Sequence, residues 1–371
     1  MLPVRRAVLW ALLASKLLAS WGVRWDIQWH VRIGRDSFWI APHVMTYAGV
    51  SLVVLLSFGV LFWETYAASA VGGGRSARGT MRVLGLTGTR GFHVAAWGVS
   101  VTVLAAPIDD LWHRLFGLDV TLWSPPHLMG FLGGQLNTLG CLLIALESYP
   151  TPGLARLGAL TVSGAWLYGS LDQVLSPAPL VAYQHGGVRF YTYVILAALL
   201  LPLALVGTTR LTGRRWTPIA LMLLVAASAL VAGQVARAGF AWFQPVSVID
   251  EEIVKDPMSP IALSHEIARK NGTRPGDSGF LTLIALVPVA VMVAVDPRRR
   301  AVVATVGWAV ALFVIYGARL SGSPAFRPMA PGAASTALAF GLTVAAAMLG
   351  GRAARGLSGY LTARAKSTAT P

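Results

Sequence analysis

The sequence has 371 residues, of which 55% are hydrophobic and 12% charged, and its formal net charge is +15. This composition excludes an ordinary water-soluble domain, in which about a quarter of the residues are charged. The basic residues form short clusters between apolar stretches rather than a stripe interleaved with aromatics, which argues against nucleic-acid binding. The single cysteine, Cys141, excludes an intramolecular disulfide and a thiolate metal cluster.

Apolar stretches of about twenty residues recur along the chain, and each is long enough to cross the hydrocarbon core of a bilayer. We therefore predict an all-α, polytopic integral membrane protein with about ten transmembrane helices. The helices are expected near residues 7–30, 43–66, 91–113, 127–147, 155–174, 189–208, 216–240, 279–296, 300–318 and 334–352. The first stretch is expected to be retained as a helix, because it lacks a clear small-x-small cleavage site.

Clusters of basic residues in the connections predict the orientation of these helices. They lie before the first helix, in the second, sixth and eighth connections, and at the C-terminus. They are Arg5 and Arg6; Arg75, Arg78, Arg82 and Arg90; Arg210, Arg214 and Arg215; Arg298, Arg299 and Arg300; and Arg352, Arg355, Arg364 and Lys366. All of them fall on one side if both termini are cytoplasmic, because cytoplasmic loops carry an excess of lysine and arginine. We therefore expect a multi-pass protein of the cell membrane.

The N-terminal half contains two copies of one stretch, residues 26–45 and 109–129. Both copies contain aspartate, Trp-His, glycine, a second aspartate, tryptophan and Pro-His-x-Met, in that order. Each copy continues to a glutamate at the same distance from its first aspartate, and we expect these glutamates, Glu64 and Glu147, to bind basic loops. The repeated unit is therefore a helical hairpin that is used twice.

The repeat divides the chain into two parts. Residues 1–150 are predicted to form the two hairpins, each with a metal site. Residues 151–371 are predicted to form a membrane helical bundle, whose role the sequence does not indicate. The segment 241–277 is too polar to span a membrane, and we expect it to form a cap or a short interfacial helix on the extracytoplasmic side.

Each copy provides three side chains of the kind that bind metals. Residues four apart on a helix lie on one face, so Asp26 and His30 project together at the outer end of the first helix. The loop then returns, and Pro42 places His43 at the start of the next helix. The second copy provides the corresponding set, Asp109, His113 and His127. We therefore predict two metal sites on the extracytoplasmic side.

The chemistry of this ligand set narrows the choice of metal. Two imidazoles and one carboxylate suit copper, zinc, iron or nickel, and a nearby thioether would favour copper. Met45 and Met129 lie two residues after His43 and His127. Their thioethers either bind the metal or pack into the hydrophobic core. Asp36 and Asp119 either orient a ligand histidine or pair with a nearby arginine. A lone histidine at a membrane-helix end is usually an interfacial polar group, whereas two sets with near-identical spacing favour metal sites.

The same residues resemble a known family. Asp-x-x-Trp-His, then Arg-Asp, then a returning histidine, resembles the C subunit of the copper membrane monooxygenases, the particulate methane and ammonia monooxygenase group. That subunit is similar in having two neighbouring sites of this kind, although Asp109 stands where the family has asparagine. The resemblance covers residues 26–45 and 109–129. It implies copper, molecular oxygen, related partner subunits and hydroxylation of a small apolar or ammonia-like substrate.

The sequence is compatible with three functions. We favour a copper-binding membrane protein that is an oxygen-dependent monooxygenase, or one subunit of such an enzyme. The alternative is a non-catalytic protein that binds, senses or transports copper or zinc. The third is a structural membrane protein whose histidines only cap helices. The expected partners are the lipid bilayer and, for an enzyme, monooxygenase-like subunits, oxygen and a small substrate; nucleic acid is not expected.

Overall fold

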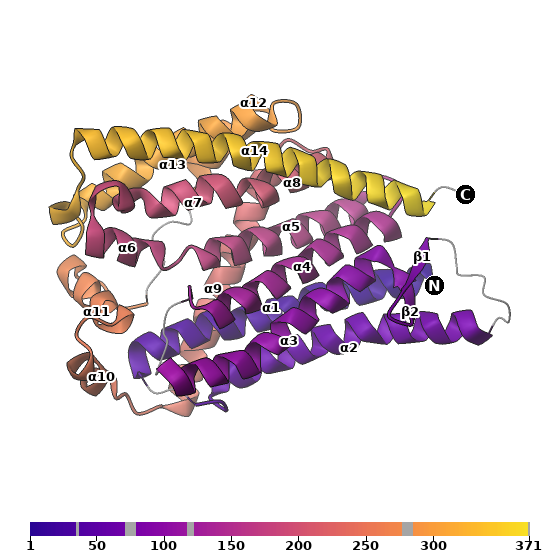
Figure 1. The fold of residues 1–371 in the computed structure, drawn as a ribbon, viewed down its shortest axis with the longest axis horizontal. Coiled ribbons are helices and arrows are strands. Elements are labelled where there is room, and N and C mark those ends of the chain that lie inside the picture. The colour runs from indigo at the N-terminus through magenta and orange to yellow at the C-terminus, as the bar shows by residue number, and fades with distance from the viewer. Residues whose placement is uncertain (35–36, 71–78, 117–121, 277–284, 370–371) are drawn as a thin grey trace.

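The computed structural model describes residues 1–34, 37–70, 79–116, 122–276 and 285–369. Over these residues the chain is almost entirely helical, and the long helices run side by side (Figure 1), which confirms the all-α prediction. The helices are α1 (Leu2–Ile33), α2 (Ala41–Ala70), α3 (Arg90–Phe116), α4 (Pro125–Ser148), α5 (Leu154–Val174), α6 (Ala178–His185), η1 (Gly187–Tyr191), α7 (Thr192–Leu200), α8 (Pro202–Thr212), α9 (Thr217–Phe243), α10 (Ile249–Lys255), α11 (Pro260–Asn271), α12 (Leu286–Val295), α13 (Ala301–Gly322), η2 (Arg327–Met329) and α14 (Ala333–Ala369).

Within the described residues, eight helical segments are long and apolar enough to cross a membrane. They are α1, α2, α3, α4, Gly187–Thr212, α9, α13 and α14. The predicted single helix near 189–208 is divided in the structure into η1, α7 and α8, because the proline ring of Pro202 cannot continue the helix. The chain therefore has the helices of a multi-pass membrane protein.

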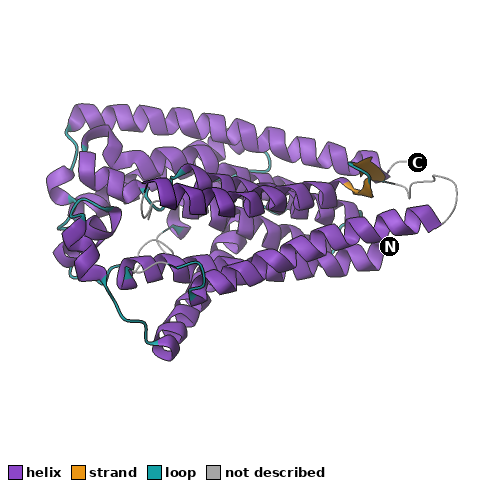
Figure 2. Ribbon diagram, turned by 60° about the horizontal axis from the view of Figure 1, so that its bottom comes forward, coloured by secondary structure: helices purple, strands orange, loops and turns teal. Residues whose placement is uncertain are grey.

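The two chain ends lie at the same end of the bundle (Figure 1). This end also carries the one two-stranded element of the described chain, β1 (Thr80–Val83) paired antiparallel with β2 (Leu86–Thr89) (Figure 2). The hairpin was not predicted. Its two-residue turn places Leu84 and Gly85 at φ 47° and 84°, the backbone twist that suits such a hairpin. The backbone N–H of Thr87 donates to Thr65 Oγ1 at 2.7 Å, which fixes the hairpin to α2.

The opposite end of the bundle carries α6, α10 and α11 (Figure 1). The helices α10 and α11 form within the segment predicted to be a cap. Ser259 is the N-cap of α11, and its hydroxyl accepts a hydrogen bond from the backbone of Ala262 at 3.2 Å. The cap is attached to the bundle at α1, where the backbone N–H of Val248 donates to the carbonyl of Ile33 at 2.8 Å.

The repeated glutamates lie at the end that holds the chain termini. Arg5 binds Glu64 with two hydrogen bonds, from Nε at 2.6 Å and from Nη2 at 2.9 Å. This pair ties the beginning of α1 to the end of α2, as expected for a glutamate that binds a basic segment. Glu147 instead accepts the backbone N–H of Gly91 at 3.2 Å, which ties the end of α4 to the beginning of α3.

Candidate metal centres

The first set of predicted ligands is brought together between α1 and α2. Asp26 and His30 lie one turn apart on α1, and His43 is the third residue of α2. The Asp26 Oδ1 atom lies 3.1 Å from His43 Nε2 and 3.4 Å from His30 Nδ1. One carboxylate oxygen therefore faces both imidazoles. We call these three residues the first triad.

The second set forms the corresponding arrangement between α3 and α4. Asp109 Oδ2 lies 3.5 Å from His113 Nε2, and Asp109 Oδ1 lies 3.4 Å from His127 Nε2. One ligand atom from each residue lies within 4.8 Å of the others, a spacing at which a single metal ion can be held. We call these residues the second triad. The six predicted ligands therefore lie in two clusters of three, but among the described residues only the second triad meets this spacing.

Each triad contains a carboxylate oxygen that lacks a hydrogen bond. Asp26 Oδ1 and Asp109 Oδ1 are buried and have no hydrogen-bond partner among the described residues. A buried oxygen of this kind is costly unless a cation or a proton satisfies it. At the second triad, His113 Nε2 and His127 Nε2 face the carboxylate, so these residues fit a divalent transition metal. At the first triad, His30 Nδ1 also lies 3.0 Å from the backbone carbonyl of Asp26, so this ring must turn before that nitrogen can bind a metal.

The ring of His43 is oriented by the loop that precedes α2. Its Nδ1 lies 3.0 Å from the carbonyl oxygen of Ser37. A carbonyl only accepts hydrogen bonds, so Nδ1 carries a proton. Nε2 then presents a lone pair toward Asp26 Oδ1 in the neutral ring, and donates a hydrogen bond to it in the charged ring. In the neutral ring the two lone pairs, 3.1 Å apart, repel each other, and either a proton or a metal ion between them removes the repulsion. A backbone carbonyl that fixes the tautomer in this way is a common support for a histidine ligand.

The local sequence explains why His43 and His127 lie at equivalent positions at the start of α2 and α4. Gly34 ends α1 with a left-handed φ of 74°, which suits glycine. His43 and His127 are each the third residue of their helix, directly after Pro42 and Pro126. Proline is accepted in the first turn, because the N–H it lacks has no partner there.

Close helix packing holds each returning helix against its partner. A Cβ atom added to Gly49 would lie 2.6 Å from the backbone nitrogen of Ala19, and one added to Gly133 would lie 2.5 Å from that of Thr102. Real Cβ atoms do not approach so closely. Each glycine lies about six residues beyond its returning histidine, so the repeat preserves the contact as well as the ligands.

The surroundings of the first triad are aromatic. Trp29 is buried, and its ring stacks on that of Phe240 from α9, with centroids 5.8 Å apart. The rings of His43 and Tyr47 lie 5.8 Å apart. Met45 packs against the buried cluster that contains Trp29, which supports the core-packing alternative for this methionine. Of these rings, that of Tyr47 contacts a triad residue, and the triad side chains are 15–22% exposed.

The second triad lies on a more exposed helix end. Leu111, Leu115 and Phe116 on α3 are all more than half exposed. The Trp112 and Phe116 rings contact each other at 4.4 Å. Arg114 forms an ion pair with Asp110 on the same helix, at 2.7 Å. Asp36 and Asp119, which were predicted to orient a histidine or to pair with an arginine, lie outside the described residues. The predicted role of these two aspartates is therefore still a prediction.

Two buried polar groups were not recognised in the sequence. Lys16 Nζ donates to Asn137 Oδ1 at 2.9 Å between α1 and α4. Tyr193 donates to Asp172 Oδ1 at 2.7 Å between α7 and α5. The signal was present, because a charged residue within an apolar stretch is costly and indicates a specific partner.

The comparisons with known proteins found no similar protein, so the two triads are the main evidence on function. Neither the protein-family models, nor the curated proteins, nor the solved structures contain a match to this chain.

Proposed function

We propose that this chain is a copper-binding integral membrane protein. The observation that carries the proposal is the convergence, twice, of two histidines on an aspartate that has a buried carboxylate oxygen. Imidazole-rich sites bind copper(II) more tightly than the other divalent metals of the first transition row. Zinc suits the same ligands less strongly.

The proposed topology has ten membrane crossings, with both termini in the cytoplasm and both triads on the extracytoplasmic side. The eight apolar segments support it, and so do α5, a helix of 21 residues, and the short apolar helix α12. An even number of crossings agrees with the position of both chain ends at one end of the bundle (Figure 1). The excess of arginine in connections at that end favours the cytoplasm.

We further propose an oxygen-dependent monooxygenase, or a subunit of one that acts on a small substrate. Three protein ligands leave coordination positions open, and bound copper would supply one-electron redox chemistry with oxygen there. The chain's own residues hold the ion and fix the His43 ring through Ser37. The resemblance of residues 26–45 and 109–129 to the C subunit of the copper membrane monooxygenases supports this reaction class, although Asp109 departs from the family pattern.

The second candidate function is a non-catalytic copper or zinc protein that captures the metal for sensing or transport. The partial exposure of the second triad favours it, because His113 and His127 side chains are 23% and 27% exposed and therefore reachable from outside. The polar pair of Lys16 and Asn137 within the bundle does not support copper transport through the membrane, since neither side chain is a preferred copper ligand.

The test is the copper content of the purified full chain, measured by elemental analysis. His30→Ala and His113→Ala should each remove the copper bound at one triad, and the double variant should remove both. His185→Ala is the matched control, because this histidine is exposed and lies in neither triad. Unchanged copper in the double variant would refute the metal sites. Oxygen consumption with a reductant and short-chain substrates then separates an enzyme from a binding protein.

A further inference from the structure

A hollow of about 380 Å³ lies between the end of α8 and the C-terminal part of α14. Its wall consists of Arg210, Ser358, Gly359, Thr362, Ala363 and Lys366. These six residues provide two cations, two hydroxyl groups and no carboxylate. We call this feature the α8–α14 hollow. It is far along the sequence from both triads and lies toward the end of the bundle that carries the chain termini (Figure 1).

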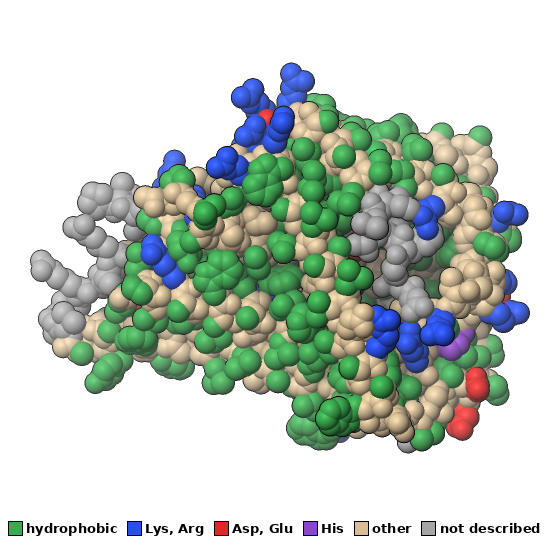
Figure 3. Space-filling model, turned by 180° about the vertical axis from the view of Figure 1, so that it is seen from behind, with side chains coloured by type: hydrophobic (Ala, Val, Ile, Leu, Met, Phe, Trp, Pro, Cys, Tyr) green, Lys and Arg blue, Asp and Glu red, His purple; other side chains and the backbone are tan. Residues whose placement is uncertain are grey.

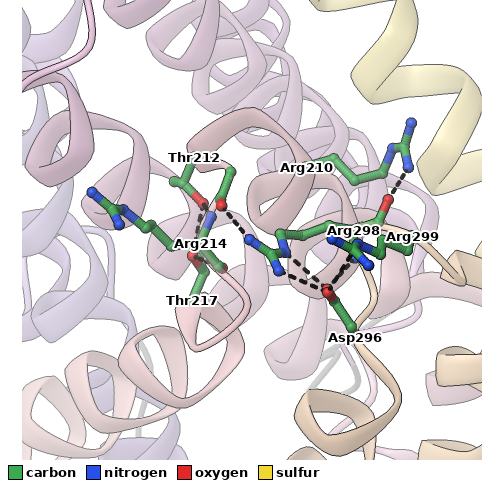
Figure 4. A network of polar contacts seen from close by, with 8 residues as sticks. Arg210, Thr212, Arg214, Thr217, Asp296, Arg298 and Arg299 are labelled. Atoms are coloured by element: carbon green, nitrogen blue, oxygen red, sulfur yellow. Dashed lines mark hydrogen bonds and ion pairs between the residues drawn. The ribbon is translucent and has the colours of Figure 1, made fainter.

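The guanidinium group of Arg210 is held in place at this hollow. Its Nε donates to Ser358 Oγ at 3.1 Å, and its Nη1 donates to the carbonyl of Arg298 at 2.6 Å. Arg298 is itself fixed, because its Nη1 donates to the carbonyl of Gly213 at 2.9 Å (Figure 4). A cation held by two neighbouring segments loses little conformational freedom when it binds a ligand.

The acidic group in this network does not neutralise the hollow. Asp296 accepts hydrogen bonds from Arg298 Nε at 2.9 Å and Nη2 at 2.7 Å, and Arg299 Nε lies 3.9 Å away (Figure 4). The hydrogen bonds from Arg298 hold the pKa of Asp296 at about 2, so its charge is fully formed and fully paired with arginine at neutral pH. Both charged side chains that line the hollow, Arg210 and Lys366, are therefore positive.

The neighbouring surface favours a ligand that is anionic at one end and apolar at the other. Met348 lies eleven residues before Gly359, which places it near the same face of α14 three turns away, and it is partly exposed. Leu349 beside it is more than half exposed. The face of the molecule opposite to the view of Figure 1 is also broadly hydrophobic, with Lys and Arg side chains gathered toward its edges (Figure 3). An anionic phospholipid has this distribution of charge and apolar surface.

We propose that the α8–α14 hollow binds the phosphate group of an anionic phospholipid. The guanidinium of Arg210 and the ammonium of Lys366 donate hydrogen bonds, and phosphate oxygens accept them. The hydroxyl groups of Ser358 and Thr362 already donate to the carbonyls of Arg355 and Ser358, so the two cations carry the recognition. The acyl chains lie along the apolar face of α14 beyond Gly359. On the proposed topology the hollow faces the cytoplasmic leaflet, where anionic lipids attract basic residues.

The experiment is native mass spectrometry of the full chain taken from vesicles of phosphatidylcholine with and without phosphatidylglycerol. The wild-type chain should retain phosphatidylglycerol in preference to phosphatidylcholine. Lys366→Gln should weaken this retention about fivefold, as expected for one basic residue at a membrane surface. Gly359→Leu should also weaken it, because the leucine fills the hollow without changing any charge, and nothing lies within 4 Å of the added Cβ.

The matched control is Arg215→Gln. Arg215 is exposed and does not line the hollow, so its loss removes the same charge and should leave retention unchanged. Equal retention by wild type and by both hollow variants would overturn the site. Inorganic phosphate that binds at the hollow, together with equal retention of the two lipids, would overturn the lipid as the source of the phosphate group.

Discussion

The two hairpins share a sequence pattern but not an environment. In the first triad one oxygen of Asp26 faces both imidazoles, and α9 and the outer cap pack around the end of α1. In the second triad each oxygen of Asp109 faces one imidazole, and the end of α3 is exposed. The comparison teaches that a repeat can preserve ligand spacing while the rest of the chain decides how well each site is enclosed.

This difference predicts different metal exchange at the two triads. The side chains of the first triad are 15–22% exposed and those of the second triad 23–29%, so water and chelators reach the second set of ligands more readily. A more exposed site exchanges faster with the same ligands. We therefore expect copper at the second triad to be removed first by an external chelator.

The largest expected effect is on stability, and it tests the close glycine contact that both hairpins share. Gly49→Ala and Gly133→Ala should each lower the free energy of unfolding by about 2 kcal/mol, since the added methyl group forces two helix backbones apart. Thermal unfolding in detergent measures this change, and the copper content should fall only in the altered hairpin.

The controls are Gly59→Ala on α2 and Gly134→Ala on α4, where a Cβ meets nothing within 4 Å. These controls should be neutral or slightly stabilising, because alanine favours a helix over glycine. If Gly49→Ala and Gly133→Ala behave like the controls, close packing does not position the histidines.

A smaller effect, on the rate of copper removal, tests the packing of α9 against the first hairpin. Phe240→Ala removes the ring that stacks on Trp29, so water should reach the first triad more easily. In a His113→Ala background, which leaves the first triad, chelator removal of copper should become about tenfold faster, equivalent to ~1.4 kcal/mol.

The same substitution in a His30→Ala background, which leaves the second triad, should have no effect on the rate. Leu230→Ala, at an exposed position of α9, controls for general loosening of this helix. An equal acceleration at both triads would show that α9 does not distinguish them.

The smallest effect concerns the cap beside the first hairpin. Hydrogen bonds from Lys270 and Tyr183 hold the pKa of Glu266 on α11 below its usual range. A lowered folded-state pKa stabilises the protein above the unfolded pKa, about 4.3, and the stabilisation is lost as the pH falls through the folded value. Glu266→Gln should therefore lower Tm by about 1 °C at neutral pH, as for an exposed ion pair.

The difference in Tm between Glu266→Gln and wild type should disappear in acid, where the wild-type carboxyl group is protonated. Lys255→Gln on α10, which breaks a comparable exposed pair with Glu252, is the control for the loss of any ion pair in the cap. A Tm difference that persists at low pH would contradict the ionic origin of the effect.

Much of the bundle and of both triads could be predicted from the sequence, because the signals are local. Apolar length predicts membrane helices, and the four-residue spacing from Asp26 to His30 places both side chains on one face. Proline before His43 indicates a helix start. These features depend on neighbouring residues and not on the tertiary fold.

Other features could not be predicted, because they depend on contacts between distant segments. The stacking of Phe240 on Trp29 joins residues more than two hundred positions apart, and no local pattern indicates it. The β1–β2 hairpin uses Leu84 at positive φ, where glycine or asparagine is usual, so its turn carried no clear signal. The break at Pro202 was readable, but the apolar residues on both sides outweighed it.

The ties at the terminal end of each hairpin have a consequence for the origin of the repeat. Arg5 and Glu64 close the first unit, and Gly91 and Glu147 close the second, so each unit is fastened by groups encoded within it. A DNA segment that encodes one unit could be copied in tandem without any new supporting contact elsewhere. Each copy would then begin with its own fastening, and only its neighbours would decide the setting in which it works.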